Sequence, residues 1–81
     1  MNSLFVDKRG IELRVDNNAL TIYEKNLRVS TVPLAPLKRI FLQGDVQLSA
    51  SVLAKLGDYQ IGVAVLYDYT AQPTLLMPTY S

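Results

Sequence analysis

Residues 11–16 alternate strictly between apolar and charged side chains, in the order Ile-Glu-Leu-Arg-Val-Asp. A period of two residues is typical of a β-strand that has one buried and one solvent-facing side. The segments 19–24 and 27–32 are also rich in strand-forming residues, and each follows the preceding segment after only two residues. Such short connections favour antiparallel hairpins. With the apolar run at residues 4–6 and the turn at residues 7–10, the sequence predicts a four-stranded antiparallel meander.

The chain changes character after this predicted meander. The segment Pro-Leu-Ala-Pro at residues 33–36 predicts a rigid crossover, because proline removes a backbone donor and holds the preceding residue extended. Farther along, Ser49 is a good N-cap for a short helix at about residues 50–56. Gly57 occupies the position expected just past the end of such a helix.

Two apolar segments flank the predicted helix, at residues 39–42 and 61–66. The second is apolar throughout, as in a strand covered on both faces, so we expect the two to pair in parallel through a right-handed crossover. A last short strand is predicted at residues 74–77. The fold class is therefore α+β and predominantly β: an antiparallel meander plus a βαβ unit, forming a small mixed sheet or sandwich with one short helix. We expect a single domain over residues 1–81.

The 81 residues include no Cys and no His. These absences exclude disulfides, a thiolate nucleophile, an imidazole base and the usual zinc ligands. Asp7, Asp45 and Asp58 belong to separate predicted turns, where Asp commonly caps the backbone, so they are weak candidates for a metal site. We expect this chain to have no catalytic residue, no metal site and no cofactor of its own.

The sequence predicts neither a membrane-spanning helix nor a signal peptide. No stretch approaches the roughly 18 apolar residues that a membrane-spanning helix needs. The N-terminus lacks the basic region and the long apolar run of a signal peptide. The sequence therefore predicts a soluble, cytoplasmic domain.

The charges are distributed unevenly along the chain. Residues 1–40 carry seven Lys and Arg against four Asp and Glu, which gives +3, whereas residues 41–81 carry one against three, which gives −2. This asymmetry is compatible with a modest polyanion contact in the first half. A stand-alone small β module that binds nucleic acid is one possible function, although tight binding by the chain alone would need more phosphate contacts than this charge supports.

Three segments, taken in order, resemble the CRISPR-associated integrase family, which inserts new spacers into CRISPR arrays. They are residues 4–16, residues 32–49 with Arg-Ile-Phe-Leu-Gln-Gly-Asp-Val in the middle and followed by the short helix and Gly57, and the apolar strand at residues 61–66. Together they span most of the chain and correspond to the N-terminal β domain of that family. The resemblance implies that metal-binding Glu, His and Asp, with a divalent Mg or Mn ion, belong to a helical catalytic domain of the full-length parent and lie outside residues 1–81.

The resemblance also implies a structural role for this domain. It implies that the domain helps to pair two subunits into a homodimer, which a second CRISPR adaptation protein bridges to another. The assembly braces double-stranded DNA, both the prespacer and the CRISPR repeat, mainly in the full-length complex. The implied setting is the cytoplasm of a prokaryote, or a phage-encoded system. No catalytic role transfers to any residue of this chain.

Lys8 and Arg9 are candidates for contact with DNA because they stand together on the first predicted turn. The resemblance places this turn near bound DNA, where two cations could contact phosphates. The alternative is a solvated turn whose charges serve only solubility.

Arg14 and Tyr23 are the other candidates for contact with DNA. Arg14, together with Arg28, is expected on the solvent-facing side of the strands and could extend a basic stripe. Tyr23 could stack on a terminal base pair, or it could pack at the sheet margin with its hydroxyl in water. The alternative for both arginines is an exposed ion pair with an acidic residue of the same sheet: Glu12, Asp16 or Glu24.

Aromatic and apolar residues gather near the end of the chain and predict a dimer surface. Tyr and Met are enriched at protein interfaces. The alternative is a loop that folds over its own small core. The candidate interface residues are Tyr67, Tyr69, Leu75 and Met77.

Overall fold

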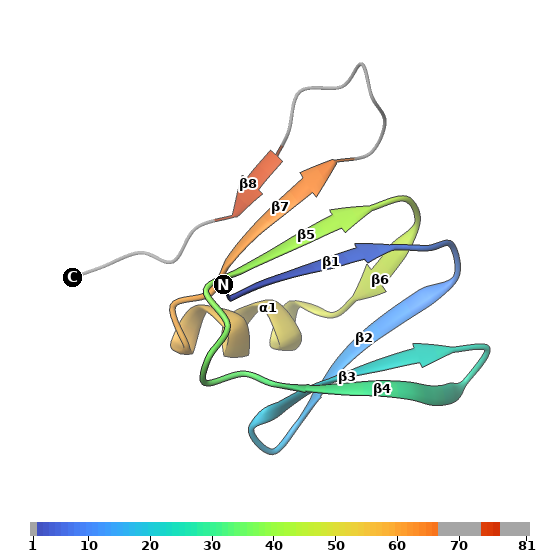
Figure 1. Cartoon of the computed structure of the whole chain (residues 1–81), viewed down its shortest axis with the longest axis horizontal. Coiled ribbons are helices and arrows are strands. Elements are labelled where there is room, and N and C mark those ends of the chain that lie inside the picture. Colours follow the sequence, from blue (N-terminus) through green and yellow to red (C-terminus); the bar gives the residue numbers. More distant parts are fainter. Residues whose placement is uncertain (1, 67–73, 77–81) are drawn as a thin grey trace.

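The computed structural model describes residues 2–66 and 74–76 (Figure 1). Within these residues the chain forms two four-stranded sheets and one helix, which confirms the predicted α+β, predominantly β class. One sheet has the strand order β4-β3-β2-β6 and the other β1-β5-β7-β8. The elements are β1 (Ser3–Asp7), β2 (Ile11–Asp16), β3 (Ala19–Glu24), β4 (Leu27–Pro33), β5 (Arg39–Gln43), β6 (Val46–Leu48), α1 (Ala50–Asp58), β7 (Gly62–Leu66) and β8 (Thr74–Leu76).

Strands β2, β3 and β4 form the antiparallel meander that the alternating pattern predicts. Their connections are two-residue turns, and Asn17, Lys25 and Asn26 all have positive φ, at 57°, 52° and 64°. Turns with positive φ match the right-handed twist of the strands that they join. Short local turns therefore set the register of this part of the sheet.

The prediction that β1 is the first strand of this meander is wrong. Strand β1 pairs in parallel with β5, from Ser3 opposite Arg39 to Asp7 opposite Gln43. The reason lies in β5, where Ile40 and Leu42 are buried on one side of the strand and Phe41 is half-buried on the other. A strand that is apolar on both sides belongs in the interior of a sheet, where it has two neighbouring strands. For β5 one neighbour is β7 and the other is β1.

The predicted parallel unit is confirmed, because β5 pairs in parallel with β7 across α1. The helix begins as predicted, with the Ser49 hydroxyl accepting a hydrogen bond from the Val52 amide at 3.2 Å. It ends later than predicted, at Asp58, and Gly57 lies inside it. The left-handed residue past its end is Gln60, with φ 58°.

Backbone hydrogen bonds explain where the helix ends. The Ile61 amide donates to the Leu56 carbonyl at 2.9 Å, and the Gln60 amide donates to the Gly57 carbonyl at 2.9 Å. These two bonds make a Schellman motif, in which an apolar residue after the helix packs on its last turn. Leu56 and Ile61 are 1% and 2% exposed, so burial of this pair determines the end of the helix rather than the glycine.

Two further elements complete the sheets. Strand β6 was not predicted; it pairs in parallel with β2, with Ile11 opposite Val46 and Leu13 opposite Leu48. Strand β8 lies within the predicted segment 74–77, at the edge of its sheet, antiparallel to β7.

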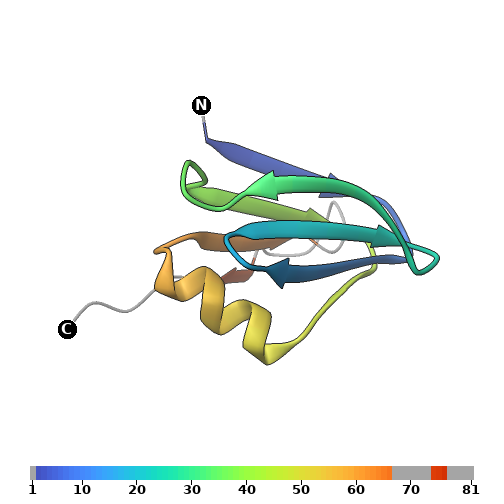
Figure 2. The ribbon, with the colours of Figure 1, turned by 90° about the horizontal axis from the view of Figure 1, so that it is seen from below.

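The core lies between the two sheets, and α1 packs along one side of it (Figure 2). Leu13 and Leu20 from one sheet and Ile40 from the other are at most 1% exposed. Leu34, from the proline-rich crossover, is fully buried with them. No helix in the described part of the chain is long and apolar enough to cross a membrane.

Candidate nucleic-acid interface

Tyr23 lies between two arginines on the outer face of the sheet β4-β3-β2-β6. Its Cα partners are Glu12 on β2 and Arg28 on β4. The Arg14 guanidinium carbon lies 4.1 Å from the centroid of the Tyr23 ring, and that of Arg28 lies 5.9 Å from it. Both distances are within the range of cation–π attraction. We refer to Arg14, Tyr23 and Arg28 as the Arg-Tyr-Arg cluster.

Short polar contacts hold the two arginines in place. Arg14 donates to Glu12 at 2.9 Å, and Arg28 donates to Asp16 at 3.5 Å and to the Tyr23 hydroxyl at 3.4 Å. The two arginine side chains are 47% and 49% exposed. A guanidinium has five N–H donors, so each arginine keeps donors that face solvent. These pairs are the ones that the alternative for Arg14 and Arg28 predicts.

The cluster also shifts the protonation equilibria of its members. The hydrogen bond from Arg28 lowers the pKa of Tyr23 below its ordinary value of 10.0. The hydrogen bond from Arg14 likewise lowers the pKa of Glu12 below 4.5. In return, hydrogen bonds to Glu12 and to the Tyr23 hydroxyl raise the pKa values of Arg14 and Arg28 above the ordinary value of an arginine. Both cations therefore stay charged across the neutral pH range, and the lowered pKa makes the phenol a stronger hydrogen-bond donor.

Thr21 supports the cluster from within the sheet. It is 1% exposed although Tyr23, two residues along the same strand, is on the outer face. Its hydroxyl donates to the Arg14 backbone carbonyl at 3.1 Å, which satisfies the buried polar group and ties β3 to β2 beside the cluster.

A polar hollow adjoins the cluster and was not predicted. It has a volume of about 180 Å³, and Tyr23, Lys25, Asn26 and Gln47 are among its lining residues. Lys25 and Asn26 form the β3–β4 turn, and Gln47 lies on the unpredicted strand β6. Glu12 and Asp45 line it as well, so two carboxylates oppose the single lysine and the hollow suits a phosphate less well than the cluster does. The sequence signal that could have indicated this hollow is the pair Lys25-Asn26 in the β3–β4 turn.

The structure brings together some of the predicted DNA contacts and separates others. Arg14 and Tyr23 lie in one cluster, and Arg28 belongs to it as well. Lys8 lines a groove between the two sheets instead, and Arg9 is exposed on the turn between β1 and β2. Contact of Lys8 and Arg9 with DNA stays a prediction.

Most of the predicted dimer residues lie outside the described part of the chain. These are Tyr67, Tyr69 and Met77, whereas Leu75 lies on β8, with Ala64 as its Cα partner. Their role in pairing stays a prediction.

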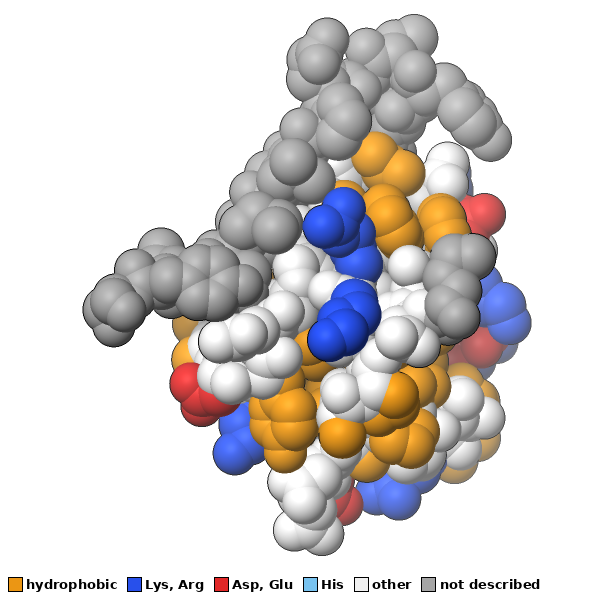
Figure 3. Space-filling model, turned by 60° about the vertical axis from the view of Figure 1, so that its left-hand side comes forward, with side chains coloured by type: hydrophobic (Ala, Val, Ile, Leu, Met, Phe, Trp, Pro, Cys, Tyr) orange, Lys and Arg blue, Asp and Glu red, His pale blue; other side chains and the backbone are white. Residues whose placement is uncertain are grey.

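The structure exposes an aromatic pair that the sequence did not single out. Phe5 on β1 is 68% exposed and stacks on Phe41 of β5, with ring centroids 4.5 Å apart. Apolar side chains also reach the surface in two areas of the face shown in Figure 3, with basic side chains between them. The register places Phe5, Phe41 and Ala64 in one cross-strand row.

The residues that the structure describes do not converge on a divalent metal site. The chain has no His or Cys, and the described residues contain no group of three or more potential metal ligands. Hard divalent cations require several oxygen ligands converging on one point. No step of any reaction is therefore assigned to a metal held by these residues.

Known proteins resemble this chain in sequence. The family model described as CRISPR associated protein Cas1 matches residues 4–81. A protein of Thermodesulfovibrio yellowstonii named CRISPR-associated endonuclease Cas1 1 is 40% identical over 67 residues, which cover 83% of this chain and 20% of the relative. The chain thus spans about a fifth of the length of that relative.

Solved structures share the fold. A TtCas1–DNA complex has a TM-score of 0.79 at 17% identity, covering 95% of this chain and 26% of that one. A CAS1 protein from Thermotoga maritima has a TM-score of 0.70 at 20% identity, covering 79% and 20%. A Cas6-RT-Cas1–Cas2 complex has a TM-score of 0.84 at 16% identity, covering 96% and 9%. With the family match over nearly its whole length, this two-sheet domain belongs to the CRISPR associated protein Cas1 family.

Proposed function

We propose that the chain is a non-catalytic structural domain of a CRISPR integrase and that it braces prespacer DNA through the Arg-Tyr-Arg cluster. The observation that carries the proposal is the Arg14 guanidinium, held 4.1 Å from the Tyr23 ring centroid on an exposed sheet face. Charged donors fixed beside an aromatic ring suit both phosphates and base faces. The solved complex of a family member with DNA supports this choice of ligand.

The chemistry of the parent protein belongs to this proposal too. The curated relative is named an endonuclease, and the chain covers a fifth of it. We assign metal-dependent cutting and joining of DNA, with Mg or Mn, to a helical domain outside these residues. The Cas1–Cas2 complex among the similar structures supports a second adaptation protein as partner, and the cytoplasm is the compartment in which such an assembly meets DNA.

Pairing with a second copy is the other part of the proposed role. The exposed Phe5–Phe41 stack supports it, because an isolated apolar pair on a sheet face gains free energy when it is covered. On that face Asp7 lies at one end of β1, and Arg39 lies opposite the other end. If two copies pack face to face with antiparallel strands, Asp7 of each approaches Arg39 of the other, so the surface is complementary to itself.

Fluorescence anisotropy with a labelled duplex of about 25 base pairs tests the DNA contact. Replacing both Arg14 and Arg28 with Gln should weaken binding and reduce the slope of log K against log salt by about 1 for each lost phosphate contact. Lys55→Gln on α1 is the matched control, because it removes one charge away from the cluster. Equal losses in the control and the double variant would refute the cluster as the contact. If the chain alone binds DNA tightly, and neither the double variant nor the Lys55 control changes that binding, the result would favour a stand-alone nucleic-acid-binding module.

A further inference from the structure

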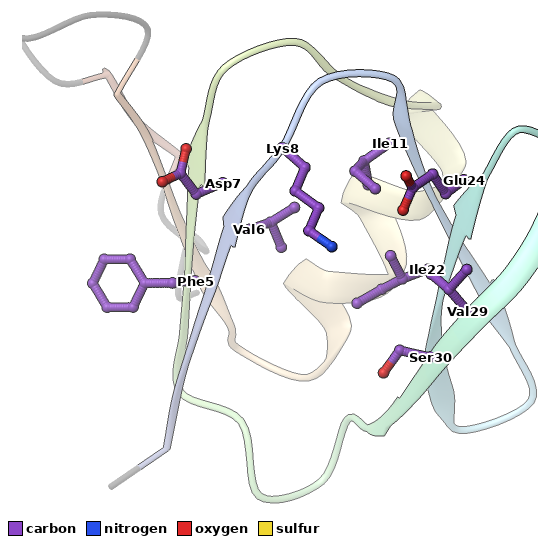
Figure 4. Close-up of a pocket in the computed structure, with 9 residues that line it drawn as sticks. All are labelled: Phe5, Val6, Asp7, Lys8, Ile11, Ile22, Glu24, Val29 and Ser30. Atoms are coloured by element: carbon purple, nitrogen blue, oxygen red, sulfur yellow. The ribbon is translucent and has the colours of Figure 1, made fainter.

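A groove of about 550 Å³ opens between the two sheets (Figure 4). One wall comes from β1 and the residues that follow it, and the other comes from β3 and β4. This groove lies on the inner side of the sheets, whereas the Arg-Tyr-Arg cluster lies on the outer face of one of them. It is a separate site from the proposed DNA contact.

The lining of the groove is largely apolar. Val6 and Ile11 form its deep part and are 6% and 3% exposed. Ile22 and Val29 face them from the other wall, and Val29 is 55% exposed although it is a large apolar side chain (Figure 4). Covering such side chains is favourable at about 25 cal/mol for each Å² of apolar surface removed from water. The groove therefore has a driving force for taking up an apolar side chain.

A cation stands over this apolar lining. The Lys8 side chain extends into the groove, between Val6 and Ile22 (Figure 4). Among the described residues the ion pairs are those of Arg14 and Arg28, and none involves Lys8. Two carboxylates, Asp7 and Glu24, also line the groove, but the Asp7 side chain points away from it (Figure 4), and neither forms an ion pair with Lys8. An amine in this position would be complemented by a carboxylate that comes from outside.

Backbone groups at the rim narrow the choice of occupant. Strands β1 and β4 are the edge strands of their sheets, so each has a single strand neighbour in the described part of the chain. An edge strand presents unpaired N–H and C=O groups, which bind an added strand. The pairing of β4 with β3 shifts register between Ile22 and Tyr23, whereas β1 pairs evenly with β5 throughout. The regular edge of β1 is the better template, because irregularities of this kind hinder strand addition.

We infer that the groove binds an extended peptide segment of a partner protein, which adds to the edge of β1. Side chains of a strand alternate between its two sides, so every second residue of the segment faces the groove. One of these is apolar and packs against Ile22 and Val29. The next one along that side is acidic and meets the Lys8 amine. A small apolar ligand would use the lining but neither the strand edge nor an acidic group.

The test is a titration of the ¹⁵N-labelled 81-residue chain with a capped peptide, Thr-Val-Thr-Val-Thr-Asp-Thr, up to about 1 mM. We expect amide shifts confined to β1, Lys8 and the walls of the groove, together with slower solvent exchange of the β1 amides. The same peptide with N-methylated backbone should not bind, because it lacks the donors that pair with the strand edge. A peptide with Asn in place of Asp should bind more weakly.

Two variants should act in opposite directions. Lys8→Ala should weaken peptide binding about three- to tenfold, as expected for one exposed charged contact, and Lys8→Arg should largely restore it. Glu24→Gln should strengthen binding, because it removes a carboxylate that repels the peptide's own. Lys55→Ala is the matched control: it removes a lysine of α1 that does not line the groove.

Three outcomes would overturn the inference. The first is no shift up to about 1 mM, and the second is shifts centred on Phe41 and its β7 neighbour Ala64, away from the edge of β1. The third is concentration-dependent shifts at β1 without peptide, which would make a second copy the occupant. DNA binding by the Arg14 and Arg28 variants is measured separately, so failure of either proposal leaves the other standing.

Discussion

The two sheets present opposite chemistry on their outer faces. On β4-β3-β2-β6, Tyr23 is surrounded by arginines and carboxylates that hold one another at 2.9–3.5 Å. On β1-β5-β7-β8, Phe5 and Phe41 stack with their rings 13° from parallel, and Phe5 is 68% exposed. On the first face the arginines are already paired with carboxylates, and they keep further N–H donors that face solvent. The second keeps an apolar surface in water, which is stabilised only when something covers it.

The sheets also differ in how the chain builds them. The meander β2-β3-β4 joins neighbouring segments through two-residue turns. The parallel pairs β1–β5 and β5–β7 join segments far apart in the sequence, such as Val6 with Leu42. The closure of long loops costs entropy before any contact is gained, so this second sheet depends on the shared core for its formation. The polar face thus belongs to a sheet that short turns specify, and the apolar face to a sheet that depends on the core. Substitutions on one face can therefore change its surface without changing the other.

The largest expected effect compares the core side chains of the two sheets. Ile40→Ala and Leu20→Ala each remove a fully buried side chain, and each should lower the free energy of unfolding by about 3 kcal/mol. Urea unfolding followed by circular dichroism should give one transition for both variants, because the side chains share one core. Two transitions in the Ile40 variant alone would show that the sheets unfold separately, which would break the dependence of one sheet on the other.

Sequence patterns predicted the locally built sheet better than the other. The alternation at 11–16 and the Asn-rich turn after it determine which side of β2 is buried, so the meander follows from neighbouring residues. The pairing of β1 depended instead on β5 needing two neighbours, a property of the assembled sheet. Similarly, Leu56 and Ile61 moved the helix end past Gly57 through packing that becomes visible only in three dimensions.

The candidate site shows the same limit. Arg14 and Tyr23 could be chosen as exposed residues on predicted strands, and the ion pair of Arg14 with Glu12 follows from their spacing on one side of β2. The approach of Arg28 required the cross-strand register of β4 on β3. The exposure of Phe5 likewise could not be predicted without knowing that β1 pairs with β5. The sequence pattern predicted β1 as the first strand of the meander, which would give Phe5 a different neighbour.

The second prediction concerns the apolar face. Phe5→Ser should cost about 1 kcal/mol of unfolding free energy through the lost aromatic stack. It should also lower self-association, measured by sedimentation velocity over a range of concentrations. Tyr23→Ser is the comparison on the polar face and should leave self-association unchanged. If Tyr23→Ser reduced self-association as much as Phe5→Ser, the pairing surface would lie on the other sheet.

The third prediction concerns the local turns of the meander. Lys25 has φ 52°, a conformation that a residue with a Cβ adopts at a cost of about 1 kcal/mol and that glycine adopts freely. Lys25→Gly should therefore raise the free energy of unfolding by up to about 1 kcal/mol. The gain is smaller to the extent that glycine also increases the conformational entropy of the unfolded chain. Thermal unfolding measures the change. Lys38→Gly, outside the left-handed turns, should lower stability instead. A drop in both variants would mean that the turn does not limit the stability of the meander.

The smallest effects are titrations within the Arg-Tyr-Arg cluster, and they test whether its contacts persist in solution. Arg28→Met should raise the pKa of Tyr23 toward 10.0, because it removes the hydrogen bond that is the main cause of the lowering. Arg14→Met should raise the pKa of Glu12 toward 4.5 for the same reason. NMR titration of the phenol and carboxyl carbons measures both values, and each variant is the control for the other.

The direction of the pH dependence follows from these shifts. Glu12 has a folded pKa below its unfolded value, so its ion pair with Arg14 stabilises the fold above pH 4.5 and loses this contribution as pH falls through the folded pKa. The pKa of Tyr23 is also lowered in the folded state, so its effect on stability has the same sign. Its contribution to the stability of the fold is present above pH 10.0 and is lost as pH falls through the lowered pKa. In its protonated form the Tyr23 hydroxyl can donate to a phosphate while it accepts from Arg28. Unchanged titrations in both variants would mean that the side chains move apart in solution, which would remove the fixed geometry on which the contrast between the two faces rests.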